Sequence, residues 1–135
     1  MKKIMLVDDS AMMRTIIRNL LEGDPQIEVA GVAANGQEAL DLLAEAKPDL
    51  ILLDIEMPVM TGLEFLPHAR LKTKAKIVIL SSIAIAGSEA ASKAKELGAD
   101  AIISKPSGAV SFDLAEKRGS EIRQVIYEQL SLPMN

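Results

Sequence analysis

The sequence contains no cysteine, no tryptophan, and only two phenylalanines and one tyrosine. Without cysteine the chain can form neither disulfides nor thiolate zinc sites, and it has no cysteine nucleophile; this composition fits a reducing compartment. The few aromatic residues, Phe65, Phe112 and Tyr127, cannot build the stacking platforms on which single-strand nucleic-acid binders depend. The sequence therefore speaks against a disulfide scaffold, a zinc module and a stacking nucleic-acid binder.

An excess of positive charge and long hydrophobic runs are also missing. With 15 basic and 19 acidic residues the net charge is −4, so nothing attracts the chain generally to phosphate backbones, and we expect no direct nucleic-acid binding. Only four apolar residues, 4–7, follow the N-terminal Met-Lys-Lys before an aspartate, which is too short for a signal-peptide core. No run approaches the roughly 18 apolar residues of a membrane span. We expect a cytoplasmic protein with no membrane insertion.

What is present is the composition of one folded domain. The chain has 135 residues, of which 49% are hydrophobic and 25% charged, close to the average for globular domains. This length suits one hydrophobic core and leaves no room for two full-sized domains. We therefore expect residues 1–135 to form a single domain.

Short apolar runs alternate with segments of helical periodicity along the whole chain. Strands are predicted at residues 3–7, 26–33, 50–53, 77–80 and 101–104, and helices at about 10–22, 35–47, 63–71, 88–97 and 120–131. Ser10 is a predicted N-cap, and Gly23 and Gly98 are predicted helix ends. Pro67 interrupts the third helical segment, so that helix is expected to start late or to kink. Residues 107–111 are the only linker-like stretch.

Five strands alternating with five helices predict the fold class. Right-handed crossovers place helices on both faces of a parallel sheet, which makes this an α/β protein with a single doubly wound sheet. The wholly apolar run at residues 50–53 is typical of a central strand that is covered on both faces. We predict the flavodoxin-like strand order 2-1-3-4-5.

Polar residues follow the predicted strands where ligands bind in such sheets, beyond the carboxyl ends of the strands. Asp8 and Asp9 follow the first strand, Asp54 the third, Ser81 the fourth and Lys105 the fifth. Three carboxylates gathered at one edge repel one another and need a compensating cation. Mg²⁺ is the hard divalent cation that such oxygen ligands suit, and the sequence therefore predicts a magnesium site.

Four segments resemble, in order and at the right strand ends, the signature positions of the response-regulator receiver family. They are residues 8–10 (Asp-Asp-Ser), 54–62 (Asp-Ile-Glu-Met-Pro-Val-Met-Thr-Gly), 81–82 (Ser-Ser) and 105–107 (Lys-Pro-Ser). Within the family, the glutamate of Asp-Ile-Glu-Met-Pro, the double serine and Lys-Pro-Ser-Gly look most like the regulatory domain of the chemotaxis methylesterase. The resemblance covers residues 1 to about 130.

The resemblance implies the role of each site residue. Asp54 would be phosphorylated, and Asp8 and Asp9 would hold Mg²⁺ together with Asp54 and the backbone carbonyl of Glu56. Ser81 would hydrogen-bond the phosphoryl group. Lys105 would pair with the phosphoryl group, and the bond between residues 105 and 106 would be cis.

The resemblance also implies partners and a switch. A histidine kinase of a two-component or chemotaxis-type system would supply the phosphoryl group, and the altered surface would bind a downstream protein target. The protein would be a phosphoacceptor that assists its own phosphorylation and dephosphorylation rather than an enzyme with a separate substrate. Ile102 stands where family members often carry a tyrosine or phenylalanine that switches rotamer, so we expect Ser81 and Ile102 to form the switch. His68 is interpreted as a solvated helix residue.

Two other functions fit parts of this pattern. A small Mg²⁺-dependent phosphohydrolase that uses an aspartyl phosphate normally carries a second aspartate two positions after the nucleophile, where this chain has Glu56, and usually brings a cap domain. A flavodoxin-like cofactor binder would need a phosphate-binding loop after the first strand, where Asp8 and Asp9 would repel a phosphate. Turnover of a phosphomonoester would identify the first alternative, and a flavin spectrum the second.

Overall fold

The computed structural model describes residues 1–55, 59–81, 89–104 and 112–132, and for residues 81, 104 and 112–120 it describes the backbone alone. The strands are β1 (Lys2–Val7), β2 (Ile27–Ala33), β3 (Leu50–Leu53), β4 (Lys76–Ser81) and β5 (Ala101–Ser104). The helices are α1 (Ala11–Leu21), α2 (Gly36–Ala46), α3 (Gly62–Lys72), α4 (Glu89–Glu96) and α5 (Phe112–Leu130).

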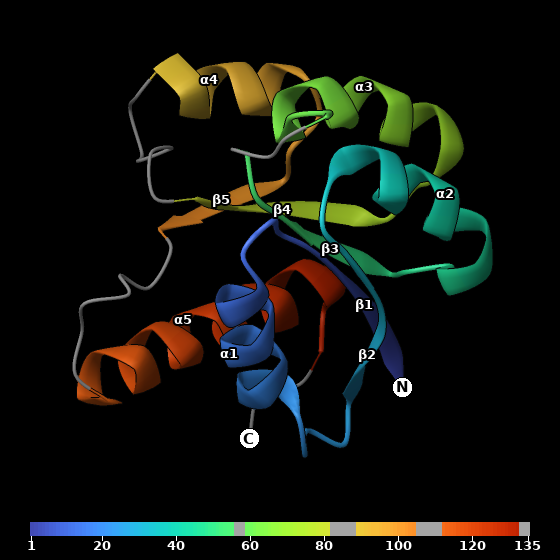
Figure 1. Ribbon diagram of the computed structural model, residues 1–135. Coiled ribbons are helices and arrows are strands. Elements are labelled where there is room, and N and C mark those ends of the chain that lie inside the picture. Colours follow the sequence, from blue (N-terminus) through green and yellow to red (C-terminus); the bar gives the residue numbers. More distant parts are fainter. Residues whose placement is uncertain (56–58, 82–88, 105–111, 133–135) are drawn as a thin grey trace.

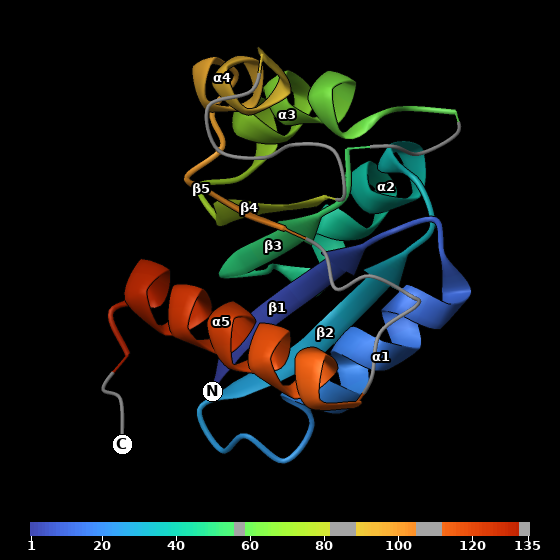
Figure 2. The ribbon, with the colours of Figure 1, turned by 90° about the vertical axis from the view of Figure 1, so that its left-hand side faces the viewer.

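The strands form one parallel sheet in the order β2-β1-β3-β4-β5, which confirms the predicted fold class and strand order. Helices α2, α3 and α4 cover one face of the sheet and α1 and α5 cover the other, so the molecule has three layers (Figures 1 and 2). None of the helices in the described part of the chain is both long and apolar enough to cross a membrane.

The central strand β3 shows why both faces are covered. All four of its residues are buried, and they alternate between the two cores because successive side chains of a strand point to opposite faces. Ile51 and Leu53 belong to the core under α2 and α3, whereas Leu50 and Leu52 belong to the core under α1 and α5. No residue of a strand that is buried on both faces points to solvent, so its residues are apolar and polar residues follow only after the strand ends.

Most predicted boundaries are confirmed to within one residue. The side chain of Ser10 caps α1 by accepting a hydrogen bond from the amide of Met13, as predicted, and Asn35 caps α2 in the same way. Gly23 and Gly98 have φ angles of +84° and +116°, a left-handed conformation that glycine adopts without strain. These local signals set the ends of the helices independently of the rest of the fold.

The expectation that Pro67 delays the start of α3 is wrong, and so is the predicted start of α5. Helix α3 begins within one residue of its predicted start and runs through Pro67, because Thr61 and Glu64 form a capping box and the helix buries Phe65 and Leu66. Helix α5 begins at Phe112, eight residues before the predicted start at about residue 120. The helix runs through the glycine at position 119, because an interior glycine costs a helix only about 1 kcal/mol and good helix formers precede it. The predicted linker at residues 107–111 lies outside the described residues.

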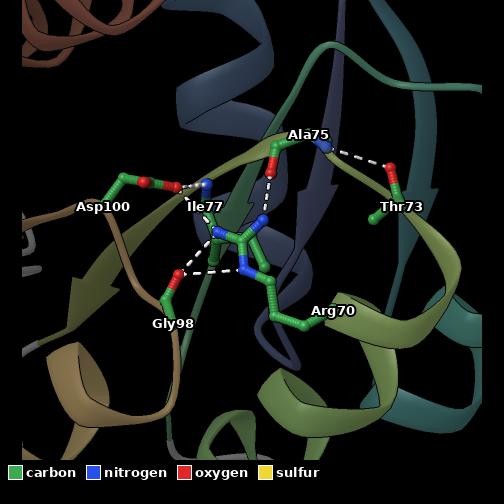
Figure 3. A network of polar contacts seen from close by, with 6 residues as sticks. All are labelled: Arg70, Thr73, Ala75, Ile77, Gly98 and Asp100. Atoms are coloured by element: carbon green, nitrogen blue, oxygen red, sulfur yellow. Dashed lines mark hydrogen bonds and ion pairs between the residues drawn. The ribbon is translucent and has the colours of Figure 1, made fainter.

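A polar network ties together the elements at the amino end of the sheet (Figure 3). The guanidinium of Arg70 in α3 donates from Nε to the carbonyl of Gly98 at 3.0 Å and from Nη1 to that of Ala75 at 2.7 Å, and it pairs with Asp100 at 2.7 Å. The Asp100 carboxylate also accepts from the amide of Ile77 at 2.9 Å. Arg70 therefore joins α3, the start of β4 and the turn between α4 and β5.

Helix α5 is fastened to the end of α1 by a second set of polar contacts. The Tyr127 hydroxyl donates to the carboxylate of Asp24, and Nε of Arg123 donates to the carbonyl of Leu20 at 3.0 Å. The bond to Asp24 raises the pKa of Tyr127 above its ordinary value of 10.0, because it favours the protonated phenol beside a carboxylate. Below these contacts Ile122 and Ile126 are fully buried.

Candidate phosphoacceptor and metal site

The register of the central strands places two aspartates beside each other at the carboxyl edge of the sheet. Val7 of β1 pairs with Leu53 of β3, so Asp8 and Asp54 are the next residues on adjacent strands. The amide of Asp54 donates to the carbonyl of Val7 at 2.9 Å, which continues the ladder by one residue. The parallel sheet therefore brings together two carboxylates that lie 46 positions apart in the sequence.

Asp9 completes a group of three carboxylates. One carboxylate oxygen from each of Asp8, Asp9 and Asp54 lies within 4.8 Å of the other two. Asp8 is 1% exposed and Asp54 is 4% exposed, whereas Asp9 is open to solvent. Like charges this close repel strongly where water is excluded, and a divalent cation with oxygen ligands relieves that repulsion. The predicted meeting of these three residues is confirmed, and their donor set fits Mg²⁺.

Asp8 is held in place from three directions. Its amide donates to the carbonyl of Ala33 in β2 at 3.0 Å, and its carboxylate oxygen Oδ1 accepts from the amide of Ser10 at 2.9 Å. Its carbonyl accepts from Nη1 of Arg14 in α1 at 2.6 Å. The sequence reasoning missed Arg14, although its spacing carries a signal. Arg14 is four residues after the N-cap Ser10, so it lies one helical turn above the start of α1, within reach of the strand end.

Gly62 fixes the backbone of Asp54 from the other side. The amide of Gly62 donates to the carbonyl of Ile55 at 2.8 Å. A Cβ atom at Gly62 would lie 2.3 Å from the carbonyl oxygen of Asp54, closer than any real Cβ contact. Only glycine lets α3 begin directly against the strand end that carries the carboxylate.

The remaining predicted site residues are described in part or not at all. Glu56, Lys105 and the predicted cis bond after Lys105 lie outside the described residues, as does the side chain of Ser81, whose backbone ends β4. Ile102 of β5 is partly buried against the core under α2, α3 and α4, opposite Ile79 in the register. His68 is exposed on α3, as interpreted.

The chain matches a known protein family over most of its length. Residues 4–113 match the family model described as the response regulator receiver domain. The chain belongs to this family. Four segments of the sequence resemble the signature positions of receiver domains. The strand order and the three aspartates at the carboxyl edge of the sheet agree with that resemblance.

Individual relatives of this receiver domain agree with the family. It is 46% identical over 123 residues to a protein-glutamate methylesterase/protein-glutamine glutaminase of Halalkalibacterium halodurans, covering 91% of this chain and 36% of that protein. The receiver thus spans about a third of the length of the curated relatives that it matches first. The similarity to the regulatory domain of methylesterases is confirmed.

Two solved structures are similar to this receiver over nearly its whole length. The response regulator domain of Thermotoga maritima CheB has a TM-score of 0.88 and 31% identity, covering 98% of both chains. A chain in the crystal structure of the P1 domain of CheA3 in complex with CheY6 from R. sphaeroides has a TM-score of 0.79 and 51% identity, covering 96% of this chain and 97% of that one.

Proposed function

We propose that Asp54 is the phosphoacceptor of this receiver and that a histidine kinase of a two-component or chemotaxis-type system supplies the phosphoryl group. One observation carries the proposal: Asp54 is a buried carboxylate within 4.8 Å of two others at the carboxyl edge of the sheet. Burying two acids beside a third is costly unless the site serves a cation and an incoming phosphoryl group. The similarity to a chain from a P1 domain complex favours a P1-type domain as the donor.

Asp8, Asp9 and Asp54 are the residues that would hold Mg²⁺, with the backbone carbonyl of Glu56 as a fourth ligand. Oxygen donors of this kind suit the ion, which usually retains several waters. When bound, Mg²⁺ neutralises charge on the phosphoryl oxygens during transfer. The backbones of the buried pair, Asp8 and Asp54, follow paired strand ends, so the sheet holds these two residues side by side.

The residues of the chain supply positioning and charge for the transfer itself. A carboxylate oxygen of Asp54 attacks phosphorus, the bond between phosphorus and the donor nitrogen breaks, and an acyl phosphate forms. No general base is needed, because a carboxylate attacks in its ionised form. Ser81 donates a hydrogen bond to the phosphoryl group and Lys105 pairs with its negative charge, in line with the need to stabilise the equatorial oxygens.

The phosphorylated state would be read out through β4 and β5. When Ser81 moves toward the phosphoryl group, a side chain of β5 must fill the space that Ser81 leaves. Ile102 lies on β5 and packs against the core under α2, α3 and α4. A branched aliphatic side chain has few rotamers, so Ile102 can fill that space only in part. Ile102→Ala should leave labelling of Asp54 intact but reduce the chemical-shift changes that beryllofluoride causes in β5. If beryllofluoride shifts the β5 resonances of this variant as much as those of the wild type, the proposed route through Ile102 is wrong.

In this proposal residues 1–135 act as one receiver domain that binds a downstream protein target and has no substrate other than its own phosphoryl group. The chain assists its own phosphorylation and dephosphorylation. The alternative of a separate phosphohydrolase has no observation in its favour beyond the acidic site that both functions share.

The test is labelling by acetyl phosphate in the presence of Mg²⁺, followed by intact-mass spectrometry. The wild type should gain one phosphoryl group, and Asp54→Asn should gain none. Asp41→Asn is the matched control, because Asp41 is an exposed carboxylate on α2 away from the site. Asp54→Asn labelled as fully as the control would disprove the assignment.

A further inference from the structure

Arg14 breaks a local rule of helix design at the rim of the acidic site. It lies at the end of the first turn of α1, close to the positive end of the helix dipole, which disfavours a cation, and the first turn contains no acidic residue to offset it. Its side chain is partly buried and Nη1 donates to the carbonyl of Asp8 at 2.6 Å. Departures from local preference of this kind are expected where function requires them.

The contact acts on the peptide that joins the two predicted metal ligands of this turn. The carbonyl of Asp8 belongs to the Asp8–Asp9 peptide plane, so holding that oxygen fixes the direction in which Asp9 leaves the strand. Asp9 is exposed and has no burial to hold its side chain, yet one of its carboxylate oxygens lies within 4.8 Å of those of Asp8 and Asp54. A fixed peptide plane before Asp9 supplies the restraint that packing does not.

We propose that Arg14 is a positioning residue of the metal site: its hydrogen bond to the Asp8 carbonyl presets Asp9 toward Asp8 and Asp54. The inference rests on the proposed metal site but concerns a residue with no ligand role there. The positioning effect of Arg14 on Mg²⁺ affinity is opposite in sign to the effect of its charge. A guanidinium beside three carboxylates repels a divalent cation, so charge alone predicts tighter Mg²⁺ binding once Arg14 is neutralised. Loss of positioning predicts weaker binding, because the ligands must then be ordered when the ion binds.

The two effects are separated by Mg²⁺ titrations followed in amide NMR spectra of three variants. We expect Arg14→Gln, which removes the charge and shortens the side chain, to weaken Mg²⁺ affinity about 10-fold, the lower end of what loss of a residue behind a metal ligand typically costs. Arg14→Lys keeps the charge and one donor and should recover part of the loss. Arg18→Gln is the matched control, since Arg18 is exposed one turn further along α1 and carries the same charge. It should bind Mg²⁺ as the wild type does or slightly more tightly.

A second measurement is made without metal. The amide of Ser10 donates to Oδ1 of Asp8 at 2.9 Å, so a loosened turn should speed its hydrogen exchange in Arg14→Gln and not in Arg18→Gln. Urea unfolding of each variant checks that the fold is retained, and Arg14→Lys serves if Arg14→Gln unfolds.

The outcomes distinguish this inference from the function on which it rests. Arg14→Gln that binds Mg²⁺ as tightly as the wild type, or more tightly, refutes positioning and leaves the metal site standing. A wild type that binds no Mg²⁺ at millimolar concentration refutes the proposed metal site. In that case unchanged exchange of the Ser10 amide in metal-free Arg14→Gln refutes the positioning role as well.

Discussion

Replacing Gly62 by alanine should damage both the stability of the receiver and the placement of Asp54. The added Cβ would lie 2.3 Å from the carbonyl oxygen of Asp54 and 2.8 Å from Cα of Ile55, and both are backbone atoms of a buried strand end. Helix α3 cannot retreat freely, because the amide of Gly62 is bonded to the carbonyl of Ile55. The clash must therefore be relieved by moving the helix, the strand end or both.

The magnitude follows from three terms. Forcing a methyl group into a packed site typically costs about 1–3 kcal/mol, and weakening the hydrogen bond of Gly62 adds about 1 kcal/mol. Alanine returns at most about 1 kcal/mol as a better helix former than glycine. We expect Gly62→Ala to lower the free energy of unfolding by about 1–3 kcal/mol, and the melting temperature by on the order of 10 °C.

Gly36→Ala provides a matched comparison, because Gly36 also occupies the first position of its helix. A Cβ there would lie 2.8 Å from Cγ, 2.9 Å from Cβ and 3.0 Å from the carbonyl oxygen of Met60, so its nearest contact is longer than the 2.3 Å at Gly62 and needs a smaller displacement. Urea unfolding followed by circular dichroism should show Gly62→Ala to be less stable than Gly36→Ala by about 1 kcal/mol or more. Acetyl phosphate should also label Gly62→Ala more slowly. Equal stabilities, or faster labelling of Gly62→Ala, would refute the reasoning.

Three further predictions concern other parts of the receiver. Asp9→Asn should weaken Mg²⁺ binding severalfold in an NMR titration by removing a ligand charge, and unchanged affinity would exclude Asp9 as a ligand. Val59 is 82% exposed and has a φ of +68°, a strained conformation for a β-branched residue. Val59→Asn should therefore raise the free energy of unfolding, measured in urea, by about 1 kcal/mol. A variant less stable than the wild type would contradict that strain. Because the folded state raises the pKa of Tyr127, its bond to Asp24 stabilises the fold fully below about pH 10 and is lost as the pH rises through the raised pKa. Tyr127→Phe should therefore be about 1 kcal/mol less stable at pH 7 and lose less stability above pH 10, and parallel pH profiles would exclude the bond.

Local sequence patterns by themselves determined the elements and the identity of the acidic site. The apolar run at residues 50–53 indicates a strand covered on both faces. Ser10 and Asn35 indicate helix starts, because their side chains cap the first turn through short-range hydrogen bonds. Because parallel strands all point the same way, residues that follow strands must share one edge of the sheet. Asp8, Asp9 and Asp54 could therefore be brought together from spacing alone.

Contacts between distant segments decided what spacing could not. Helix α3 keeps Pro67 because buried neighbours outweigh one missing hydrogen bond, and α5 starts at Phe112 rather than after the glycine at position 119. The role of Gly62 depends on how closely α3 approaches the end of β3, and that of Arg14 on a guanidinium reaching back to a strand carbonyl. Arg70 likewise finds its acceptors near residues 75 and 98 only once the chain is folded. The approach of Gly62 to the strand end and the acceptors of Arg70 depend on three-dimensional distances of a few ångströms, which no one-dimensional pattern encodes.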